Sequence, residues 1–147
     1  MLTSMTRRTW APGVNQVDNA LPVKAGSTIF AGAALMWNAG YLVPVSGSGA
    51  FAGFALEGSD AVAGESDGDR VIEVRQQGAV ELDINTDTVA ASDLGNSGVT
   101  IEATDDNTFR IEPGAAIVGT TIGQIMRIVT PGVAGRVLTS FKSAMIA

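Results

Sequence analysis

Residues 24–58 constrain the fold more than any other part of the chain, because glycines interrupt their apolar runs every few residues. Within KAGSTIFAGAALMWNAGYLVPVSGSGAFAGFALEG the only charged residues are Lys24 and Glu57. Such short apolar runs suit β-strands. Glycine supplies the positive φ that the tight turns between them require. The segment therefore predicts sheet and a surface suited to contact with other proteins.

The composition of the whole chain indicates the same fold class. Glycine occurs 18 times among 147 residues, dispersed along the sequence, and this exceeds the usual share of about 7%. The length fits one domain, with or without an extended arm. Cysteine is absent, so no disulfide framework is available, and its absence leaves the redox compartment open.

Short strands are expected along most of the chain. The clearest alternation places Val80, Leu82 and Ile84 on one face, opposite Glu81 and Asp83. The junction at residues 76–78 is either a turn or a bulge within one long strand. Residues 88–95 are the one helical candidate, with Asp87 or Thr88 as cap and Gly95 at the end. Strands are expected at 28–30, 34–37, 41–45, 51–57, 70–75, 78–84, 99–103, 108–112, 123–130 and 136–141, with turns at 105–107, 113–114 and 131–132.

This pattern predicts an all-β fold, a small β-sandwich or β-barrel of about ten short antiparallel strands with one short helix. Residues 1–24 show neither a period of 2 nor one of 3.6. We interpret them as an N-terminal arm, extended or disordered in the free protein, ahead of a β-rich domain at 25–147. This arm would contact a partner through Arg7, Arg8 and Trp10. The alternative is a terminus without function.

Charge and hydropathy exclude several classes of partner. The net charge is −6 and the pI is about 4.4, which argues against nucleic acid, since phosphate backbones are bound by clustered Lys and Arg. No apolar run reaches the roughly 18 residues of a membrane-spanning helix. The first 22 residues lack the apolar core of a signal peptide, so neither an export route nor a membrane partner is expected.

The residues of common catalytic sites are missing. Without His or Cys a Ser-His-Asp or Cys-His nucleophile cannot be built, and no phosphate-binding glycine motif occurs. Glu73, Glu81 and Asp83 could serve a carboxylate hydrolase, but cross-strand ion pairs with neighbouring arginines are the simpler interpretation. We expect no enzymatic activity and no cofactor.

The acidic segment 58–69 and the aromatic residues leave alternatives open. Glu65, Asp67 and Asp69 alternate around Gly68. Their carboxylate oxygens are the ligands that suit Ca²⁺, although the spacing differs from that of an EF-hand. A solvated, mobile loop without metal is the favoured interpretation. The aromatic cluster would pack in the core, line a subunit interface or stack on sugars; its members are Trp37, Tyr41, Phe51 and Phe54.

The order of these elements resembles the capsid cement, or head decoration, proteins of tailed bacteriophages. The similarity covers residues 22–112. An AG-x-x-hydrophobic-AG opening leads to a G-Y-hydrophobic-x-P segment, a G-hydrophobic-A strand, a loop of acidic and small residues, and a hydrophobic-x-V-R-x-x-G strand. These elements lie at 25–32, 40–44, 53–57, 58–69 and 71–78, and the long N-terminal arm and the C-terminal IGQIMRIVTPGVAGRVLTSFK depart from the pattern.

The resemblance implies a non-enzymatic structural protein, made in the bacterial host cytoplasm and bound to the outer surface of the virion capsid. Its partners would be the major capsid protein and further copies of itself, as a homotrimer bridging neighbouring capsomers. Arg7, Arg8 and Trp10 are then expected to contact the capsid, and Trp37 and Phe51 to lie in subunit contacts. The alternative is a binding module on the virion surface for host or glycan attachment, carried by exposed aromatic residues and glycine-rich loops.

Overall fold

The computed structural model describes residues 5–11, 15–46, 49–94, 98–102, 108–111 and 119–144. The all-β prediction is confirmed, and the helical part of these residues is a single 3-10 turn, η1 (Ala91–Asp93). The strands are β1 (Val17–Pro22), β2 (Ala34–Asn38), β3 (Tyr41–Pro44), β4 (Phe51–Ala55), β5 (Val71–Asp83), β6 (Thr88–Val89), β7 (Gly98–Glu102), β8 (Phe109–Ile111), β9 (Gly119–Thr130), β10 (Gly132–Val133) and β11 (Arg136–Lys142).

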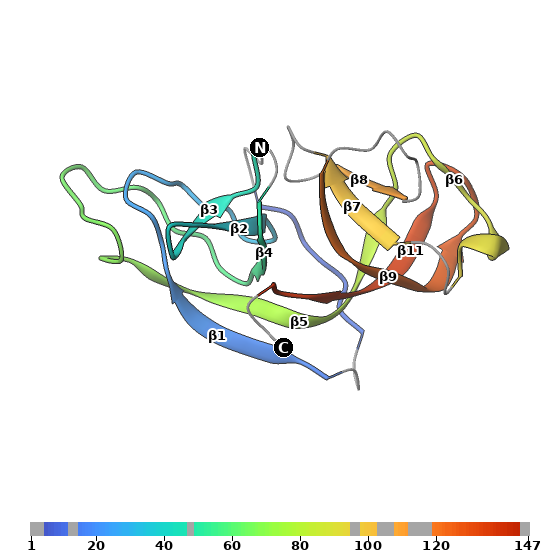
Figure 1. Ribbon diagram of the computed structural model, residues 1–147, viewed down its shortest axis with the longest axis horizontal. Helices are drawn as coiled ribbons and strands as arrows, with labels where there is room; N and C mark the ends of the chain where they lie inside the picture. The colour runs from blue at the N-terminus through green and yellow to red at the C-terminus, as the bar shows by residue number, and fades with distance from the viewer. Residues whose placement is uncertain are drawn as a thin grey trace.

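One curled antiparallel sheet contains most of the strands. Its order is β3-β2-β4-β5-β11-β9-β7-β8, with β1 also paired to β5, while β6 and β10 form a separate pair. On one side of the molecule a bridge between Val23 and Leu42 brings the end of β1 to β3. On the other side a bridge between Ile84 and Phe109 brings β8 back to the end of β5. The sheet therefore curls into two halves that share β5 (Figure 1).

Each half encloses its own apolar core. β4 lies between them, with Ala52 and Ala55 in the smaller core and Phe51 and Phe54 in the larger one. The smaller core also contains Val23, Ile29, Ala33, Leu35, Leu42, Ile72 and Val74, and the larger one is built from residues of β5, β7, β8, β9 and β11 around Phe109 and Phe141.

The long strand β5 contributes to both cores. The alternation expected for residues 80–84 is confirmed, because Val80, Leu82 and Ile84 are buried while Glu81 is half-buried and Asp83 exposed. The two expected strands at 70–75 and 78–84 are one continuous strand of 13 residues, and its pairing with β1 skips Gln76, so the junction is a bulge within one long strand rather than a turn. Its continuity fixes the two halves relative to one another.

Two of the expected elements are wrong. The expected helix at 88–95 is replaced by β6, which pairs with β10, and by the 3-10 turn η1. The side chain of Asp93 accepts the N–H of Ala90 at 2.9 Å, so a local polar side chain closes the chain into a tight turn. The expected strand at 28–30 is only an isolated bridge between Ile29 and Ser59. The turns expected at 105–107 and 113–114 lie outside the described residues.

The N-terminal segment is extended, and its described residues pack on the rest of the chain. β1 pairs with the first half of β5, a strand that the sequence VDNALP did not indicate. Further toward the N-terminus, Trp10 forms a bridge with Val80 of β5. The segment thus contributes to the sheet from which it was expected to project.

Candidate contact surfaces

The groove that holds the N-terminal segment places Trp10 among aromatic rings. Its ring centroid lies 5.9 Å from that of Phe54 and 5.9 Å from that of Phe141. The guanidinium of Arg75 lies 4.6 Å from the indole centroid, a cation–π contact. Asp18 of β1 holds this guanidinium with a bond of 2.9 Å from Nε, and hydrogen bonding to Arg75 lowers the pKa of Asp18.

The two arginines beside Trp10 differ in their surroundings. Arg8 is half-buried, and its guanidinium carbon lies 5.2 Å and 5.3 Å from the ring centroids of Phe54 and Phe109. Its Nε donates to the carbonyl of Gly32 at 2.9 Å. Arg7 is exposed. Of the three residues expected to contact a capsid, only Arg7 is directed to solvent, and a contact through Trp10 would require the segment to leave this groove.

The residues expected in subunit contacts occupy different environments. Phe51 is 2% exposed, and its ring packs on Phe54 and Phe141, so in the single chain it belongs to the core. Trp37 is half-buried against the smaller core. Its indole N–H is buried and meets no acceptor among the described residues. Of the two, Trp37 offers more surface to a second subunit.

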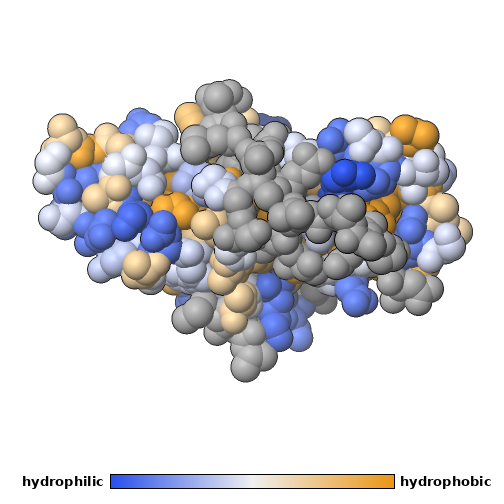
Figure 2. All heavy atoms as spheres, turned by 45° about the horizontal axis from the view of Figure 1, so that its top comes forward, coloured by the Kyte–Doolittle hydropathy of each residue, from blue (hydrophilic) through white to orange (hydrophobic). Residues whose placement is uncertain are grey.

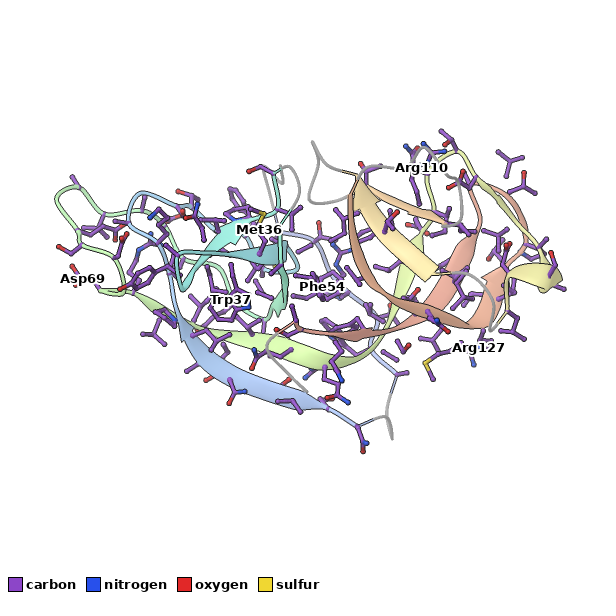
Figure 3. All side chains as sticks on the ribbon, in the orientation of Figure 1. Met36, Trp37, Phe54, Asp69, Arg110 and Arg127 are labelled. Carbon is purple, nitrogen blue, oxygen red and sulfur yellow. The ribbon has the colours of Figure 1, made fainter. Side chains whose placement is uncertain are left out.

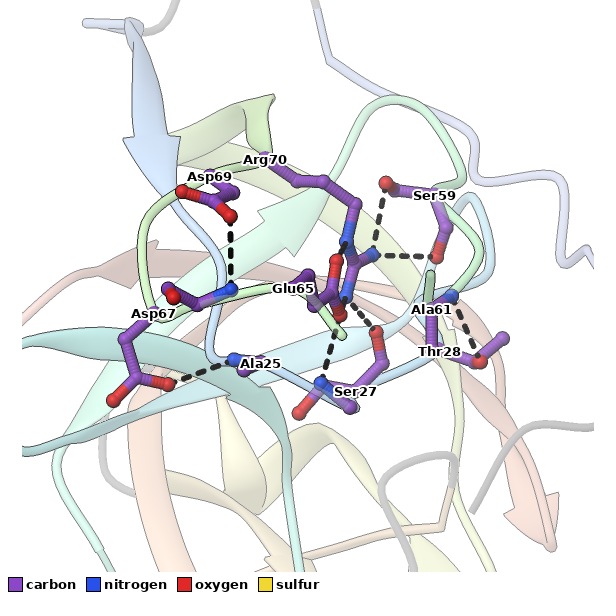
Figure 4. A network of polar contacts seen from close by, with 11 residues as sticks. Ala25, Ser27, Thr28, Ser59, Ala61, Glu65, Asp67, Asp69 and Arg70 are labelled. Atoms are coloured by element: carbon purple, nitrogen blue, oxygen red, sulfur yellow. Dashed lines mark hydrogen bonds and ion pairs between the residues drawn. The ribbon is translucent and has the colours of Figure 1, made fainter. Parts of the chain in front are cut away.

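The acidic segment is built around Arg70 (Figure 4). The Nε and Nη2 atoms of Arg70 donate to the carboxylate of Glu65 at 2.6 and 2.7 Å. The same guanidinium donates to the carbonyls of Ser59 and Ser27 at 3.2 and 2.6 Å. The side chains of Arg70 and Glu65 are only 14% and 6% exposed. A bidentate pair of this kind is the strong form of ionic hydrogen bond.

The three carboxylates expected in a solvated loop serve instead to hold the backbone. Glu65 accepts the N–H of Gly26 at 2.8 Å, Asp67 that of Ala25 at 2.9 Å, and Asp69 that of Ser66 at 2.8 Å. The interpretation of Glu65 as a solvated side chain is therefore wrong. Among the described residues no group of three metal-ligating side chains occurs.

The network makes stability depend on pH. The hydrogen bonds from Arg70, helped by the N–H of Gly26, lower the pKa of Glu65 from 4.5 to about 2. Because the folded-state pKa lies below the unfolded one, the ionised carboxylate stabilises the fold above pH 4.5. That stabilisation is lost as the pH falls from 4.5 to about 2. In urea unfolding, the stability advantage of the wild type over Glu65→Gln should shrink across this range.

A matched variant is Asp60→Asn, which changes an exposed carboxylate of the same loop. Its stability should run parallel to that of the wild type over the same range. Parallel profiles for wild type and Glu65→Gln would contradict the role assigned to the network.

A hollow of about 260 Å³ lies elsewhere, over Gly78 and Gly123, with Ile122 and Phe141 in its lining. Polar groups also line it, from Asn15, Gln77, Gln124, Ser140 and Lys142, but its one aromatic residue, Phe141, is only 2% exposed. Sugar-binding sites combine such groups with an aromatic platform. The two Trp, the one Tyr and the five Phe are all among the described residues, and none of them is exposed.

Comparisons of the chain with protein families, with curated proteins and with solved structures found no match. Within the described part of the chain, no helix has the length and apolar character needed to cross a membrane.

Proposed function

We propose that this protein is a capsid cement protein, a non-enzymatic trimer that binds the outside of a phage head and bridges neighbouring major capsid protein subunits. One structural observation carries the proposal beyond the sequence resemblance. Six of the seven large apolar side chains that are exposed in the described residues lie at the two ends of the elongated molecule. A protein that bridges two neighbours needs contact surface at both ends.

The first end is formed by the acidic loop and the start of β5. Val62 is 60% exposed and Val71 is 54% exposed. Val62 lies between Ala61 and Ala63, so the tip of the loop presents only small apolar side chains. The network around Arg70 holds the base of this loop, near Asp69 in Figure 3. The tip is therefore pre-organised, which reduces the entropy lost when it binds.

The second end is formed by the end of β9, by β10 and by the residue after η1. The pairing of β9 with β11 skips Met126 and Val129, which bulge outward and are 44% and 37% exposed. Val133 is 74% and Leu94 47% exposed. Residues 122–135 carry a single charge, that of Arg127, which is labelled at this end in Figure 3. Figure 2 shows apolar surface at both ends of the long axis.

The distribution of charge supports contact at these ends. Copies of a chain with net charge −6 repel one another and repel other acidic surfaces. Contact is therefore least costly where carboxylates are few, as at residues 61–64 and 122–135. Bulges such as those at Met126 and Val129 also twist a strand edge and hinder uncontrolled edge-to-edge pairing.

An enzymatic function and a glycan-binding function have less support than the cement function. The ionic side chains with lowered pKa values, Asp18, Glu65 and Asp87, are each bound to an arginine of the fold, so these carboxylates act in structure. A glycan-binding module would use exposed aromatic rings, and none of the aromatic side chains is exposed. A glycan array with the purified protein would reveal this alternative function.

Heads that lack the protein provide the test. Adding saturating wild-type protein should raise the temperature or the chelator concentration at which the heads disrupt. Val62→Glu and Val133→Glu each place a charge in an apolar contact, and each should weaken binding to heads about tenfold or more, a loss of about 1.4 kcal/mol. The measurement is a binding titration on purified heads.

The matched variant is Gln16→Glu, which adds the same charge at an exposed position next to Val17, whose partner Gln77 lies in the middle of β5 and away from both ends. Its affinity for heads should equal that of the wild type. Unchanged head stability at full occupancy would overturn the cement function. Wild-type affinity in both end variants would overturn the assignment of the contact ends.

A further inference from the structure

We propose that copies of the chain meet head to tail, with the loop tip at the first end of one copy docked on the second end of the next. Residues 60–64 form the tip, and all of them are exposed. The receiving surface is formed by Leu94, Met126, Arg127, Val129 and Val133. The inference rests on the trimer in the proposed function and identifies the contact that would hold it together.

The first end carries an excess of negative charge around its apolar tip. Residues 57–69 contain five carboxylates and neither Lys nor Arg. Ion pairs from Lys24 to Asp67 at 3.5 Å and from Arg70 to Glu65 at 2.6 Å offset two of them. The carboxylate of Asp60 is exposed, and no cation among the described residues binds it. The tip therefore favours a partner surface that presents a cation.

The second end presents such a cation among apolar side chains. Arg127 is exposed, and no carboxylate of the described residues binds it. Asp93, next to Leu94, turns its carboxylate to the N–H of Ala90. The arginines that form ion pairs within the chain are Arg70, Arg75, Arg110 and Arg136. An arginine surrounded by apolar side chains is typical of the residues that contribute most to a protein–protein contact.

The apolar side chains of the two ends differ in size and flexibility. At the tip they are the small side chains of residues 61–63, and a hydrogen bond of 3.2 Å from the N–H of Glu65 to the carbonyl of Val62 closes the turn. At the second end Met126 is 44% exposed, and its unbranched thioether can adapt to an irregular neighbour. A pre-organised tip against an adaptable surface buries apolar area and loses little entropy.

Charge favours contact between unlike ends over contact between like ends. Two first ends would bring two carboxylate-rich loops together, and two second ends would bring two copies of Arg127 together. Unlike ends place the carboxylates of the loop near Arg127, and such complementarity suppresses the other pairings. A second copy of this chain is therefore a partner of complementary charge for either end.

The position of the two ends requires that the contact join different copies. They lie at opposite ends of the long axis, where Figure 3 labels Asp69 and Arg127, so the tip of a chain cannot reach its own second end. A head-to-tail contact is heterologous and forms a closed ring where the rotation between copies closes, as a three-fold rotation does. Each copy then gives one tip and receives one, and the whole ring spans neighbouring capsid subunits.

Mixing two variants that are each defective at one end tests the contact. Val62→Arg places a cation at the tip, where it would face Arg127, and Val133→Glu places a carboxylate where it would face the acidic loop. Each variant alone should therefore associate about tenfold more weakly than the wild type, or not at all. Each also keeps the end that the other lacks, so the mixture should form complexes that contain both chains. Native mass spectrometry distinguishes the variants by mass.

The matched variant is again Gln16→Glu, which should form the same oligomer as the wild type. Ala63→Arg tests the same tip should Val62→Arg not fold. A mixture that stays monomeric, variants that associate alone as the wild type does, or a monomeric wild type would each overturn the contact. Association lost in Val62→Arg but kept in Val133→Glu would indicate contact between two tips and would also overturn it.

The test on heads is independent of this one. Heads that wild-type protein stabilises, together with any of these contrary outcomes, would reject the head-to-tail contact and leave the cement function in place. Complexes of both variants without any effect of the wild type on heads would reject the cement function alone.

Discussion

Replacing Trp10 by alanine is expected to lower the free energy of unfolding by about 2–4 kcal/mol. Removal of a buried aromatic side chain costs about 3–5 kcal/mol, and Trp10 is half-buried. The change empties the pocket between Phe54 and Phe141 and removes the ring beneath the Arg75 guanidinium. The loss should appear in urea or thermal unfolding of the protein without heads.

The matched variant is Arg7→Ala, three residues earlier and exposed. Its stability should stay within about 0.5 kcal/mol of the wild type, as for most surface positions. If Trp10 served only to contact a capsid, Trp10→Ala would weaken head binding and leave the unfolding curve unchanged. That outcome would contradict the place of the segment in the sheet.

Gly123→Ala is expected to destabilise the protein by about 3 kcal/mol or more, whereas Gly78→Ala should change stability by less than about 1 kcal/mol. Both glycines lie opposite Phe141, one on β9 and one on β5. A Cβ on Gly123 would overlap the carbonyl of Ser140, which is backbone and cannot turn aside. A Cβ on Gly78 would meet side-chain atoms at 3.5 Å, an ordinary contact.

The two variants form a pair with identical chemistry. Soluble yield and urea midpoints of both, measured side by side, decide the prediction. Equal stability of the two would show that β9 and β11 separate enough to admit a methyl group, and would contradict the close backbone approach at Gly123.

Local sequence pattern predicted the strands whose side chains alternate or whose ends carry glycine. β2, β3, β4 and the second half of β5 lie where they were expected, because burial on one face selects residues with a period of 2. The same reasoning failed for residues 88–94, where the polar side chain of Asp93 favours a tight turn.

The N-terminal segment could not be placed from sequence because its partners are distant. β1 has an outward-facing pattern of polar residues and joins the sheet by pairing with residues of β5 that lie 49 to 60 positions later in the sequence. Trp10 likewise finds its pocket on strands β4 and β11. A lone Trp among polar residues is compatible with a free arm and with an anchored one.

The contact surfaces could be predicted only in part. Glu65 was a candidate ligand or solvated carboxylate, and its partners Arg70 and Gly26 show it to be a structural group. The bond to Gly26 spans 39 residues of sequence. The outward bulges at Met126 and Val129 depend on the register of β9 against β11, which no local pattern in IGQIMRIVT specifies.

The sharing of β5 between both halves has a mechanical consequence. β5 has 13 residues, roughly 40 Å at about 3.3 Å per residue, and runs from the loop at one end toward the strands at the other. A pull applied at the two ends acts along this strand, and its backbone hydrogen bonds to β1, β4 and β11 are loaded in shear. Bonds loaded in shear must break together, whereas bonds at a peeled edge break one at a time. β5 therefore resists tension most strongly along the line that joins the two contact ends.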